Sequence, residues 1–223
     1  LAPEREGALD FIRRLQERGV IAAIGHTAAS EEQITAAVDA GARMSTHLGN
    51  GAHPLIKRHP NYIWAQLAED RLWAGFIADG FHLPISTLKS MLRVKGGKAI
   101  IVSDATELEG APEGIHRYGV NEVFKSKDGK VTLVSNPDIL AGSALPLDHA
   151  VNLLGKTGIA SVQEAIAMAT TRVAELLGLA DTGMGTLDEG APADFVLYES
   201  DGSQAFKVIE TVVQGKSLYA VSS

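Results

Sequence analysis

Short apolar segments that alternate with helical patterns constrain the fold of this chain more than any other feature of its sequence. Three apolar segments and one brief, more polar segment at 43–46 are predicted as strands in the first half of the chain, and a helical pattern separates each from the next. Alternation of this kind is typical of right-handed β–α–β units, which build a parallel sheet. The predicted strands cover residues 20–24, 43–46, 72–78 and 98–102.

Capping residues mark the helices between these strands. Ser30 and Gln33 have the spacing of a capping box, and Gly41 is placed to end the same helix. Asn61 is expected to cap the next helix, and Pro84 to begin the one after it. These signals predict helices at the positions that a β–α–β arrangement requires.

The pattern changes after the fourth predicted strand. An Asp-Gly turn at 128–129 lies between two apolar-rich segments and predicts a hairpin inserted at about 117–134. Helices are predicted at about 146–156 and 161–177. From Gly183 onward the pattern is that of β-strands, so an α/β fold with a small β segment is expected.

The composition excludes several classes of partner and site. The 27 acidic and 20 basic residues give a net charge of −7 (27 − 20), and no basic run is present, which argues against a nucleic-acid or membrane partner. No stretch approaches the length of an apolar membrane span, and no secretory signal is visible. The absence of cysteine excludes disulfides and thiolate ligands and fits the cytoplasm. A bound metal must therefore use His and carboxylate ligands.

Residues capable of chemistry follow each of the four predicted strands. His26 comes after the first, His47 after the second, His82 after the third and Asp104 after the fourth. Since the carboxyl ends of parallel strands face one side of a sheet, these side chains are expected to converge. Neutral imidazoles suit Zn²⁺ or Fe²⁺. The pattern predicts a metal site with His26 and His47 as ligands.

Asp104 and His82 have different possible roles beside such a metal. Asp104 follows a buried strand, so a solvated surface charge explains it poorly. Its carboxylate could take a proton from an attacking water and return it to a leaving amine. His82 could be a third ligand, a group that polarises a carbonyl or a contact to the substrate. The spacing of the residues leaves these three roles open.

Two loops could bind the remainder of a ligand. Asn50 and Gly51 offer backbone amides, and Lys57 and Arg58 offer positive charge, for an anion such as phosphate. An ordinary polar loop with surface bases is the alternative. A second loop contains small residues that would allow a ligand to approach the backbone. Its residues are Leu140, Ala141 and Gly142.

The order of the motifs resembles one known family. LAPE, GHT, THLGNG, DGFH, SDAT, LAGSAL and a GMGTLDEGAPADFVLYE tail together resemble the N-acetylglucosamine-6-phosphate deacetylases of the amidohydrolase superfamily, over essentially the whole chain. The resemblance implies the second half of a TIM-like (β/α) barrel of the metal-dependent hydrolase type. This half would cover residues 1–182, including the inserted hairpin, and residues 183–223 would form part of a small β-sandwich.

The resemblance also implies an activity and a set of site residues. The family hydrolyses the N-acetyl group of N-acetylglucosamine 6-phosphate with the help of a divalent metal, giving glucosamine 6-phosphate and acetate. Zn²⁺ is the first candidate, and Fe, Co or Mn are alternatives. His26 and His47 match the family's metal-binding histidines, and Asp104 matches its catalytic aspartate. The residues matched to contacts with the sugar phosphate are Asn50, Gly51, Arg58, His82, Leu140, Ala141 and Gly142.

Two departures from the family pattern leave alternatives open. Gly49 and Gly51 stand where relatives often have an aromatic residue and alanine, so a related N-acyl amino sugar is an alternative substrate. Another amidohydrolase acting on a cyclic amide or N-acyl amino acid is a second reading. A catalytically silent remnant that binds a sugar phosphate is a third.

The resemblance further predicts how the chain completes its site. In the family, LAPE closes the fourth barrel strand, so strands one to four and a glutamate ligand are expected to lie outside this chain. The arginine matched by Arg58 acts across a dimer interface, which predicts a homodimer. A lone half-barrel exposes unpaired strand edges, so the chain is expected to pair with further chain or to aggregate. Two half-barrels that close one barrel are a second arrangement.

Overall fold

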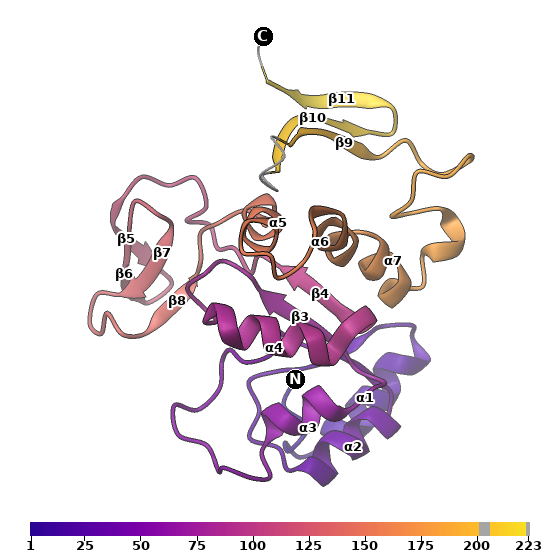
Figure 1. Ribbon diagram of the computed structural model, residues 1–223. Coiled ribbons are helices and arrows are strands. Elements are labelled where there is room, and N and C mark those ends of the chain that lie inside the picture. The colour runs from indigo at the N-terminus through magenta and orange to yellow at the C-terminus, as the bar shows by residue number, and fades with distance from the viewer. Residues whose placement is uncertain (201–205, 222–223) are drawn as a thin grey trace. The chain divides into compact units, whose positions relative to one another are not determined.

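The computed structural model describes residues 1–200 and 206–221 (Figure 1). The chain divides into two compact units, which are described separately. Unit 1 comprises residues 1–76, 86–100 and 167–188, and unit 2 comprises residues 77–85, 101–166 and 189–223. The predicted boundary after residue 182 stays a prediction.

The four predicted strands form a four-stranded sheet. Its order is β1-β2-β3-β4, and the β1–β2 and β2–β3 pairs are parallel. All five residues of β3 are buried, which explains why its sequence is a continuous apolar run. The strands are β1 (Ala22–Ile24), β2 (Ala42–Ser45), β3 (Trp73–Ile77) and β4 (Ala99–Val102).

Helices connect these strands, and the predicted caps are confirmed. The Ser30 hydroxyl accepts a hydrogen bond from the Gln33 backbone amide, and the Gln33 side-chain oxygen accepts one from the Ser30 backbone amide, which completes the capping box. The Asn61 side chain accepts from the amides of Ile63 and Trp64. The helices of this region are α1 (Ala8–Glu17), α2 (Glu31–Asp39), α3 (Tyr62–Ala68) and α4 (Ile85–Lys95), followed by a 3₁₀ turn at Gly96–Lys98.

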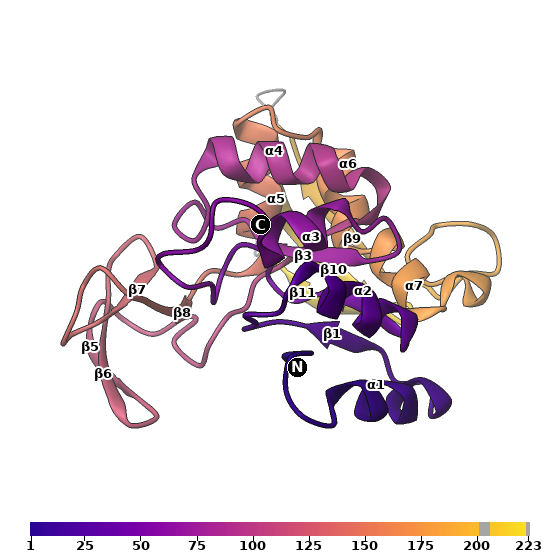
Figure 2. The ribbon, with the colours of Figure 1, turned by 90° about the horizontal axis from the view of Figure 1, so that it is seen from below.

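A buried apolar cluster in unit 1 joins the helices to the first two strands. Ile12 of α1 and Ile34 of α2 are almost fully buried against Ile24 of β1. Figure 2 shows α1 beside β1 and the N-terminal segment. This packing gives β1 and β2 a rigid support at the point where their polar carboxyl ends emerge.

The insertion in unit 2 is larger than the predicted hairpin. The expected Asp-Gly turn at 128–129 does join β6 to β7, but strands on both sides extend it to a four-stranded antiparallel sheet of order β5-β6-β7-β8. Gly119, with φ of 59°, makes a second turn between β5 and β6. The strands are β5 (Gly114–Tyr118), β6 (Asn121–Lys125), β7 (Lys130–Leu133) and β8 (Leu140–Ser143).

Two other predictions of local structure need correction. Leu140–Gly142, predicted as a loop, lies in β8 and pairs with β7. The predicted helix over 161–177 is divided into α6 (Val162–Ala169) and α7 (Thr171–Leu177), because the backbone of Thr170 leaves the helical region. Two adjacent β-branched residues, Thr170 and Thr171, favour a break there. The helix α5 (Leu147–Lys156) agrees with its prediction.

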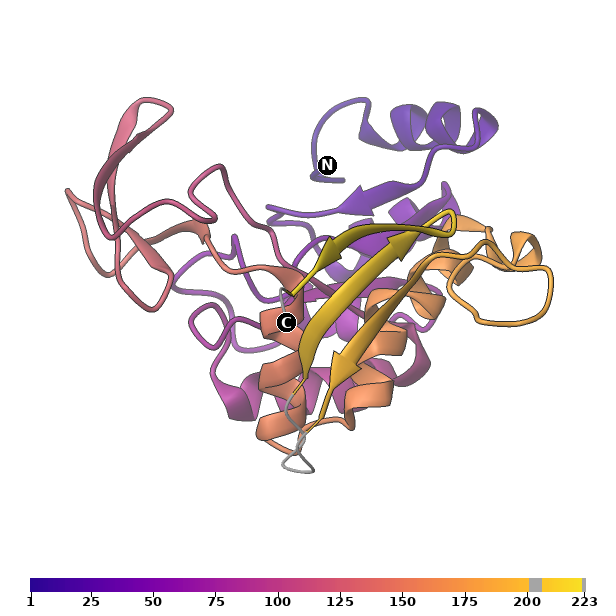
Figure 3. The ribbon, with the colours of Figure 1, turned by 90° about the horizontal axis from the view of Figure 1, so that it is seen from above.

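The last strands form an antiparallel sheet of order β11-β10-β9 (Figure 3). They follow a 3₁₀ turn at Ala180–Thr182, and every residue of β9 and β11 is exposed. None of the helices in the described part of the chain is long and apolar enough to cross a membrane. The strands are β9 (Phe195–Glu199), β10 (Lys207–Val213) and β11 (Lys216–Ala220).

Candidate metal-binding and catalytic site

His26 and His47 meet at the carboxyl ends of β1 and β2. The strand register pairs Ile24 with Ser45, and each histidine lies two residues beyond its member of that pair. The Nε2 atoms of the two imidazoles are 3.1 Å apart, and the rings are perpendicular. His47 is buried and His26 is exposed, so the nitrogen pair lies at the surface of unit 1. The predicted convergence of these two residues is therefore observed.

Three candidate residues share an uncommon backbone conformation. The φ angles of His26, His47 and Asp104 are 50°, 27° and 49°, in the left-handed region. Among the non-glycine residues that the structure describes, only Gln214 joins them. Such residues cost about 1–3 kcal/mol each and cluster at functional sites. The strained backbone at these three strand ends therefore supports the prediction that these residues belong to a functional site, independently of the sequence pattern.

Two glycines make room for the histidine pair. A Cβ at Gly51 would lie 2.6 Å from the ring atoms Cε1 and Nδ1 of His26. A Cβ at Gly25 would lie 2.8 Å from the Cβ of Thr46. Gly51 was predicted to contact the sugar phosphate, and the structure places it directly against the His26 ring. The substrate contact stays a prediction.

Buried polar atoms beside the pair lack hydrogen-bond partners within the described chain. The Nδ1 atom of His47 and the Nδ2 atom of Asn50 are both in this condition. The Asn50 amide donates to the His47 carbonyl oxygen (2.9 Å), so the two residues belong to one tight turn. Burial of unpaired polar atoms is costly, which indicates a site built to receive further groups.

Side chains of α3 hold the loop that contains the predicted phosphate ligands. The Asn61 amide nitrogen donates to the carbonyl oxygens of Lys57 (3.0 Å) and Arg58 (3.1 Å). The Tyr62 hydroxyl lies 2.9 Å from the His53 amide nitrogen and 3.0 Å from its Nδ1 atom. Lys57 and Arg58 are both exposed. The positive charges of these two side chains are therefore accessible to a ligand, while hydrogen bonds from Asn61 and Tyr62 hold the backbone of the loop.

In unit 2, Asp79 and His82 form a buried pair after β3. The Nδ1 atom of His82 lies 2.6 Å from Oδ2 of Asp79, and Oδ1 accepts from the amides of Phe81 and His82 at 2.9 Å. Burial raises the pKa of Asp79, but the hydrogen bonds from His82 and Phe81 outweigh it and hold that pKa below its ordinary value. The pair fixes the imidazole so that Nε2 remains for a ligand.

Asp104 lies beside β8, also within unit 2. The Ser143 amide donates to the Asp104 carbonyl oxygen, and the Thr106 amide donates to the Ser143 carbonyl oxygen (2.8 Å). A Cβ at Gly142 would meet Cγ2 of Thr106, which explains the small residue there. Asp104 itself is exposed. The structure thus brings the predicted residues of β8 to the segment of the proposed acid–base group.

Asp104 and His82 belong to unit 2, whereas the histidine pair belongs to unit 1. That these four side chains line one common active site stays a prediction. Within the described ranges 1–200 and 206–221, no three His, Asp or Glu side chains are arranged to hold a metal ion. The role of His26 and His47 as metal ligands stays a prediction.

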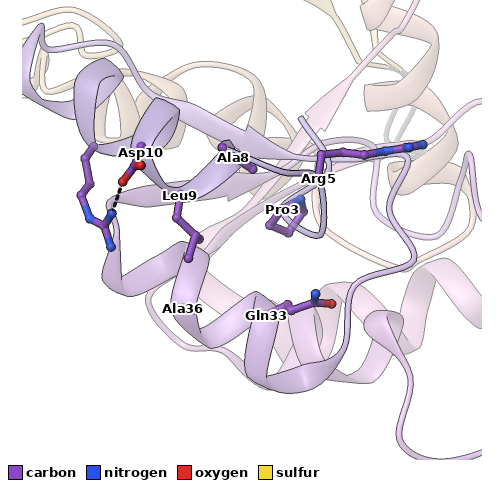
Figure 4. Close-up of a pocket in the computed structure, with 9 residues that line it drawn as sticks. Pro3, Arg5, Ala8, Leu9, Asp10, Gln33 and Ala36 are labelled. Atoms are coloured by element: carbon purple, nitrogen blue, oxygen red, sulfur yellow. Dashed lines mark hydrogen bonds and ion pairs between the residues drawn. The ribbon is translucent and has the colours of Figure 1, made fainter.

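A separate hollow of about 320 Å³ lies between the N-terminal segment and α2 (Figure 4). Pro3 and Arg5 line it from one side and Gln33 from the other, and Arg13 forms an ion pair with Asp10 at its rim (2.6 Å). It contains none of the site residues selected from the sequence. The candidate site lies at the strand ends because the residues that could bind a metal are found there, although the space beside the histidines is small.

Two residues that support the site were not predicted from the sequence. Glu4 contacts the segment after His26, and Asn61 holds the loop before α3. The helix-cap signal identified Asn61 only as a cap. A contact between Glu4 and Thr27 spans 23 residues, and no local pattern indicates it.

The chain is similar in sequence to known proteins over most of its length. The amidohydrolase family profile matches residues 5–218. An N-acetylgalactosamine-6-phosphate deacetylase of Escherichia coli O157:H7 is 37% identical over 202 residues, which cover 90% of this chain and 52% of that protein. An N-acetylglucosamine-6-phosphate deacetylase of Vibrio furnissii is 33% identical over 219 residues, which cover 98% of this chain and 53% of that protein.

A solved structure shows the same fold. The N-acetylglucosamine-6-phosphate deacetylase of Thermotoga maritima superposes with a TM-score of 0.86 at 29% identity, covering 99% of this chain and 58% of that one. The chain thus spans about half the length of the curated relatives that it matches. The prediction of an α/β fold of the TIM-barrel type is confirmed. By its sequence over residues 5–218 and by its fold, the chain belongs to the amidohydrolase family.

Proposed function

We propose that this chain serves a metal-dependent hydrolase that removes the N-acetyl group of an amino-sugar phosphate. N-acetylglucosamine 6-phosphate is the first substrate, and the products are glucosamine 6-phosphate and acetate. The observation that carries the proposal is the pair of Nε2 atoms of His26 and His47, 3.1 Å apart. The names of the Vibrio and Thermotoga relatives support the substrate class.

The nitrogen pair fits a divalent metal. Two nitrogens bound to one tetrahedral Zn²⁺ at ordinary bond lengths lie about 3.3 Å apart, close to the observed separation. Amidohydrolases are metal-dependent, and Zn²⁺ is the first candidate, with Fe, Co or Mn as alternatives. When bound, the cation would polarise the acetamide carbonyl and make a nearby water more acidic. A catalytic zinc site normally has three protein ligands, so the proposal requires one ligand beyond this pair.

The chain's own residues would handle protons and orient the substrate. The carboxylate of Asp104 would take a proton from the attacking water and give it to the nitrogen of the leaving amine. His82 would contact the sugar through Nε2, because Asp79 engages its Nδ1 atom. The phosphate would be bound by Arg58 together with Asn50 and Gly51. The strand residues Leu140, Ala141 and Gly142 would line the sugar.

We further propose that the active form is a homodimer that works in the cytoplasm. Arg58 is exposed on a loop whose backbone is held in place, which suits a side chain that reaches a partner subunit. The chain carries a net charge of −7, so attraction of an anionic substrate would depend on local positive charge such as that of the exposed Lys57 and Arg58.

Acetate release from defined sugars tests the proposal. The purified protein that contains this chain, supplied with Zn²⁺, is incubated with N-acetylglucosamine 6-phosphate and with unphosphorylated N-acetylglucosamine. Zn²⁺-dependent release from the phosphorylated sugar is the expected result, and Asp104→Asn should abolish it while the exposed control Asp188→Asn retains it. Absence of metal-dependent release from any acetylated sugar phosphate would contradict the proposal.

The galactosamine epimer is a second candidate substrate. It is favoured by the 37% identity to the Escherichia coli relative, which is named for N-acetylgalactosamine 6-phosphate. The same assay with this epimer decides between the two. A higher kcat/KM for the galactosamine phosphate would reassign the substrate without changing the reaction.

A further inference from the structure

The segment that bears His26 is held on both sides by residues near the start of the sequence. Before the histidine, the Gly25 amide donates to the Leu1 carbonyl oxygen (3.1 Å). After it, the Thr27 hydroxyl donates to Oε2 of Glu4 (2.5 Å), and the Ala28 amide donates to Oε1 (2.8 Å). One carboxylate therefore receives hydrogen bonds from the two residues that directly follow His26.

This arrangement acts on a strained position. His26 has a φ of 50°, and a backbone in the left-handed region persists only where its surroundings over-determine it. Thr27 is buried, and its hydroxyl oxygen also accepts from the Ala29 amide (3.0 Å). Glu4 is thus connected to Thr27, Ala28 and, through Thr27, to Ala29. These bonds fix the turn that aims the His26 ring at His47.

From this geometry we propose that Glu4 is a positioning residue for the His26 imidazole, and through it for the metal ligand pair. The inference rests on the proposed metal function but concerns a residue whose hydrogen bonds go to the two residues after the histidine. Glu4 would act by holding Thr27 and Ala28, so its loss should move the ring without removing a ligand. Residues that orient metal ligands typically contribute about 10–100-fold to metal affinity.

The ionisation of Glu4 suits this role. Burial raises the pKa of Glu4, but the hydrogen bonds from Ala28 and Thr27 outweigh it and hold that pKa below its ordinary value. The group is therefore a carboxylate at neutral pH and can accept both bonds. A glutamine has one acceptor oxygen and one amino group, so it can accept only one of them without reorientation.

Two measurements on the intact chain test the proposal. The first is the long-range ¹H–¹⁵N spectrum of the imidazoles without metal, which reports the state of the His26–His47 hydrogen bond. The second is the Zn²⁺ affinity measured by competition with a chromophoric chelator. Glu4→Gln is compared with Glu17→Gln, an exposed carboxylate at the end of α1. We expect Glu4→Gln to shift the His26 and His47 signals and to weaken Zn²⁺ binding by about tenfold or more.

A second pair of variants covers the case in which Glu4→Gln unfolds the chain. Thr27→Ser keeps the hydroxyl that donates to Glu4, whereas Thr27→Val keeps the shape and removes the hydroxyl. The serine variant should retain the imidazole signals of the parent, and the valine variant should reproduce the defect of Glu4→Gln. A merely structural role would instead lower the melting temperature of Glu4→Gln and of Thr27→Val and leave the imidazole signals of the folded chain unchanged.

The outcomes separate this inference from the proposed function. If Glu4→Gln leaves the imidazole signals and the Zn²⁺ affinity unchanged, the positioning role is wrong and the metal proposal stands. If the parent chain binds no Zn²⁺, the metal proposal loses its support. In that case the imidazole spectra alone decide the positioning role, and an unchanged spectrum overturns it.

Discussion

The Nε2 atoms of His26 and His47 lie 3.1 Å apart because the register of β1 and β2 places the two histidines level with each other. At that distance only one of the two nitrogens can carry a proton between them, unless a cation replaces the proton. The space between the two nitrogens can therefore hold either a proton or a metal ion. Which of the two it holds can be measured without any substrate.

Replacement of one imidazole should uncouple the pair. In His47→Gln the new side chain cannot reproduce the position of Nε2, so the contact between the two imidazoles is lost and the His26 signals should shift in the ¹⁵N spectrum. Zn²⁺ affinity should fall at least tenfold, since a ligand is removed. His116→Gln, in β5 of the antiparallel sheet, is the matched control and should bind Zn²⁺ as the parent does. Equal Zn²⁺ affinity in His47→Gln and the parent would rule out the pair as ligands.

Gly51→Ala should displace the His26 ring. The added Cβ would lie 2.6 Å from two ring atoms, and φ of 61° is unfavourable for alanine. Gly19→Ala is a close control, because Gly19 has φ of 69° with no atom within 4 Å of the new Cβ. Both variants should lose about 1 kcal/mol from backbone strain. Only Gly51→Ala should also change the imidazole spectrum, and identical spectra in the two variants would contradict the proposed packing.

Asn61→Asp should loosen the basic loop while the helix cap is kept. Aspartate retains the acceptor for the Ile63 and Trp64 amides but has no donor for the carbonyl oxygens of Lys57 and Arg58. Amide exchange should therefore quicken in the loop and stay slow in α3. In Asn61→Ala both regions should exchange faster, with about 0.5–2 kcal/mol of stability lost. Unchanged exchange in the loop of Asn61→Asp would show that the side chain serves only as a cap.

Local signals explain how much of the fold could be predicted from the sequence. The capping residues Ser30 and Asn61 and the apolar runs of β1, β3 and β4 act over a few residues, so they can be recognised one at a time. The convergence of His26 and His47 needed only the general rule that parallel strands end on one side. These features therefore agree with the structure.

The features that the sequence did not predict depend on pairing between distant segments. The sheet β5 to β8 requires a turn at Gly119 and the pairing of Leu140 with Thr132. The local sequence around Gly119 and Leu140 does not indicate either feature. Aspartate tolerates a left-handed backbone better than most residues, but the sequence does not show which aspartate adopts it, as Asp104 does. The hydrogen bonds of Glu4 to Thr27 likewise have no local sequence signal.

Asp79→Asn should destabilise the chain in a pH-dependent manner. The pKa of Asp79 in the folded chain lies below its ordinary value of 3.8, so the ionised group contributes stability that is complete above that value and is lost as the pH falls through the folded pKa. At pH 7 the asparagine variant should be less stable by about 1–3 kcal/mol, and the difference should shrink below about pH 4. Urea unfolding from pH 3 to pH 7 measures this, with exposed Asp138→Asn as the control. A difference that is constant with pH would contradict the role of the charge.

Asn152→Ala should detach the C-terminal sheet from α5 within unit 2. Oδ1 of Asn152 accepts from the Phe206 amide (2.8 Å), and its Nδ2 donates to the Phe206 carbonyl oxygen, so the side chain pairs with the backbone just before β10 as a neighbouring strand would. Phe206 is buried, so alanine would leave two buried backbone groups unpaired, at a cost of about 1–3 kcal/mol. Amide exchange should quicken in β9 to β11 and remain unchanged in β5 to β8. The exposed α6 variant Gln163→Ala should show neither effect, and slow exchange in β10 of Asn152→Ala would mean that other contacts hold the sheet.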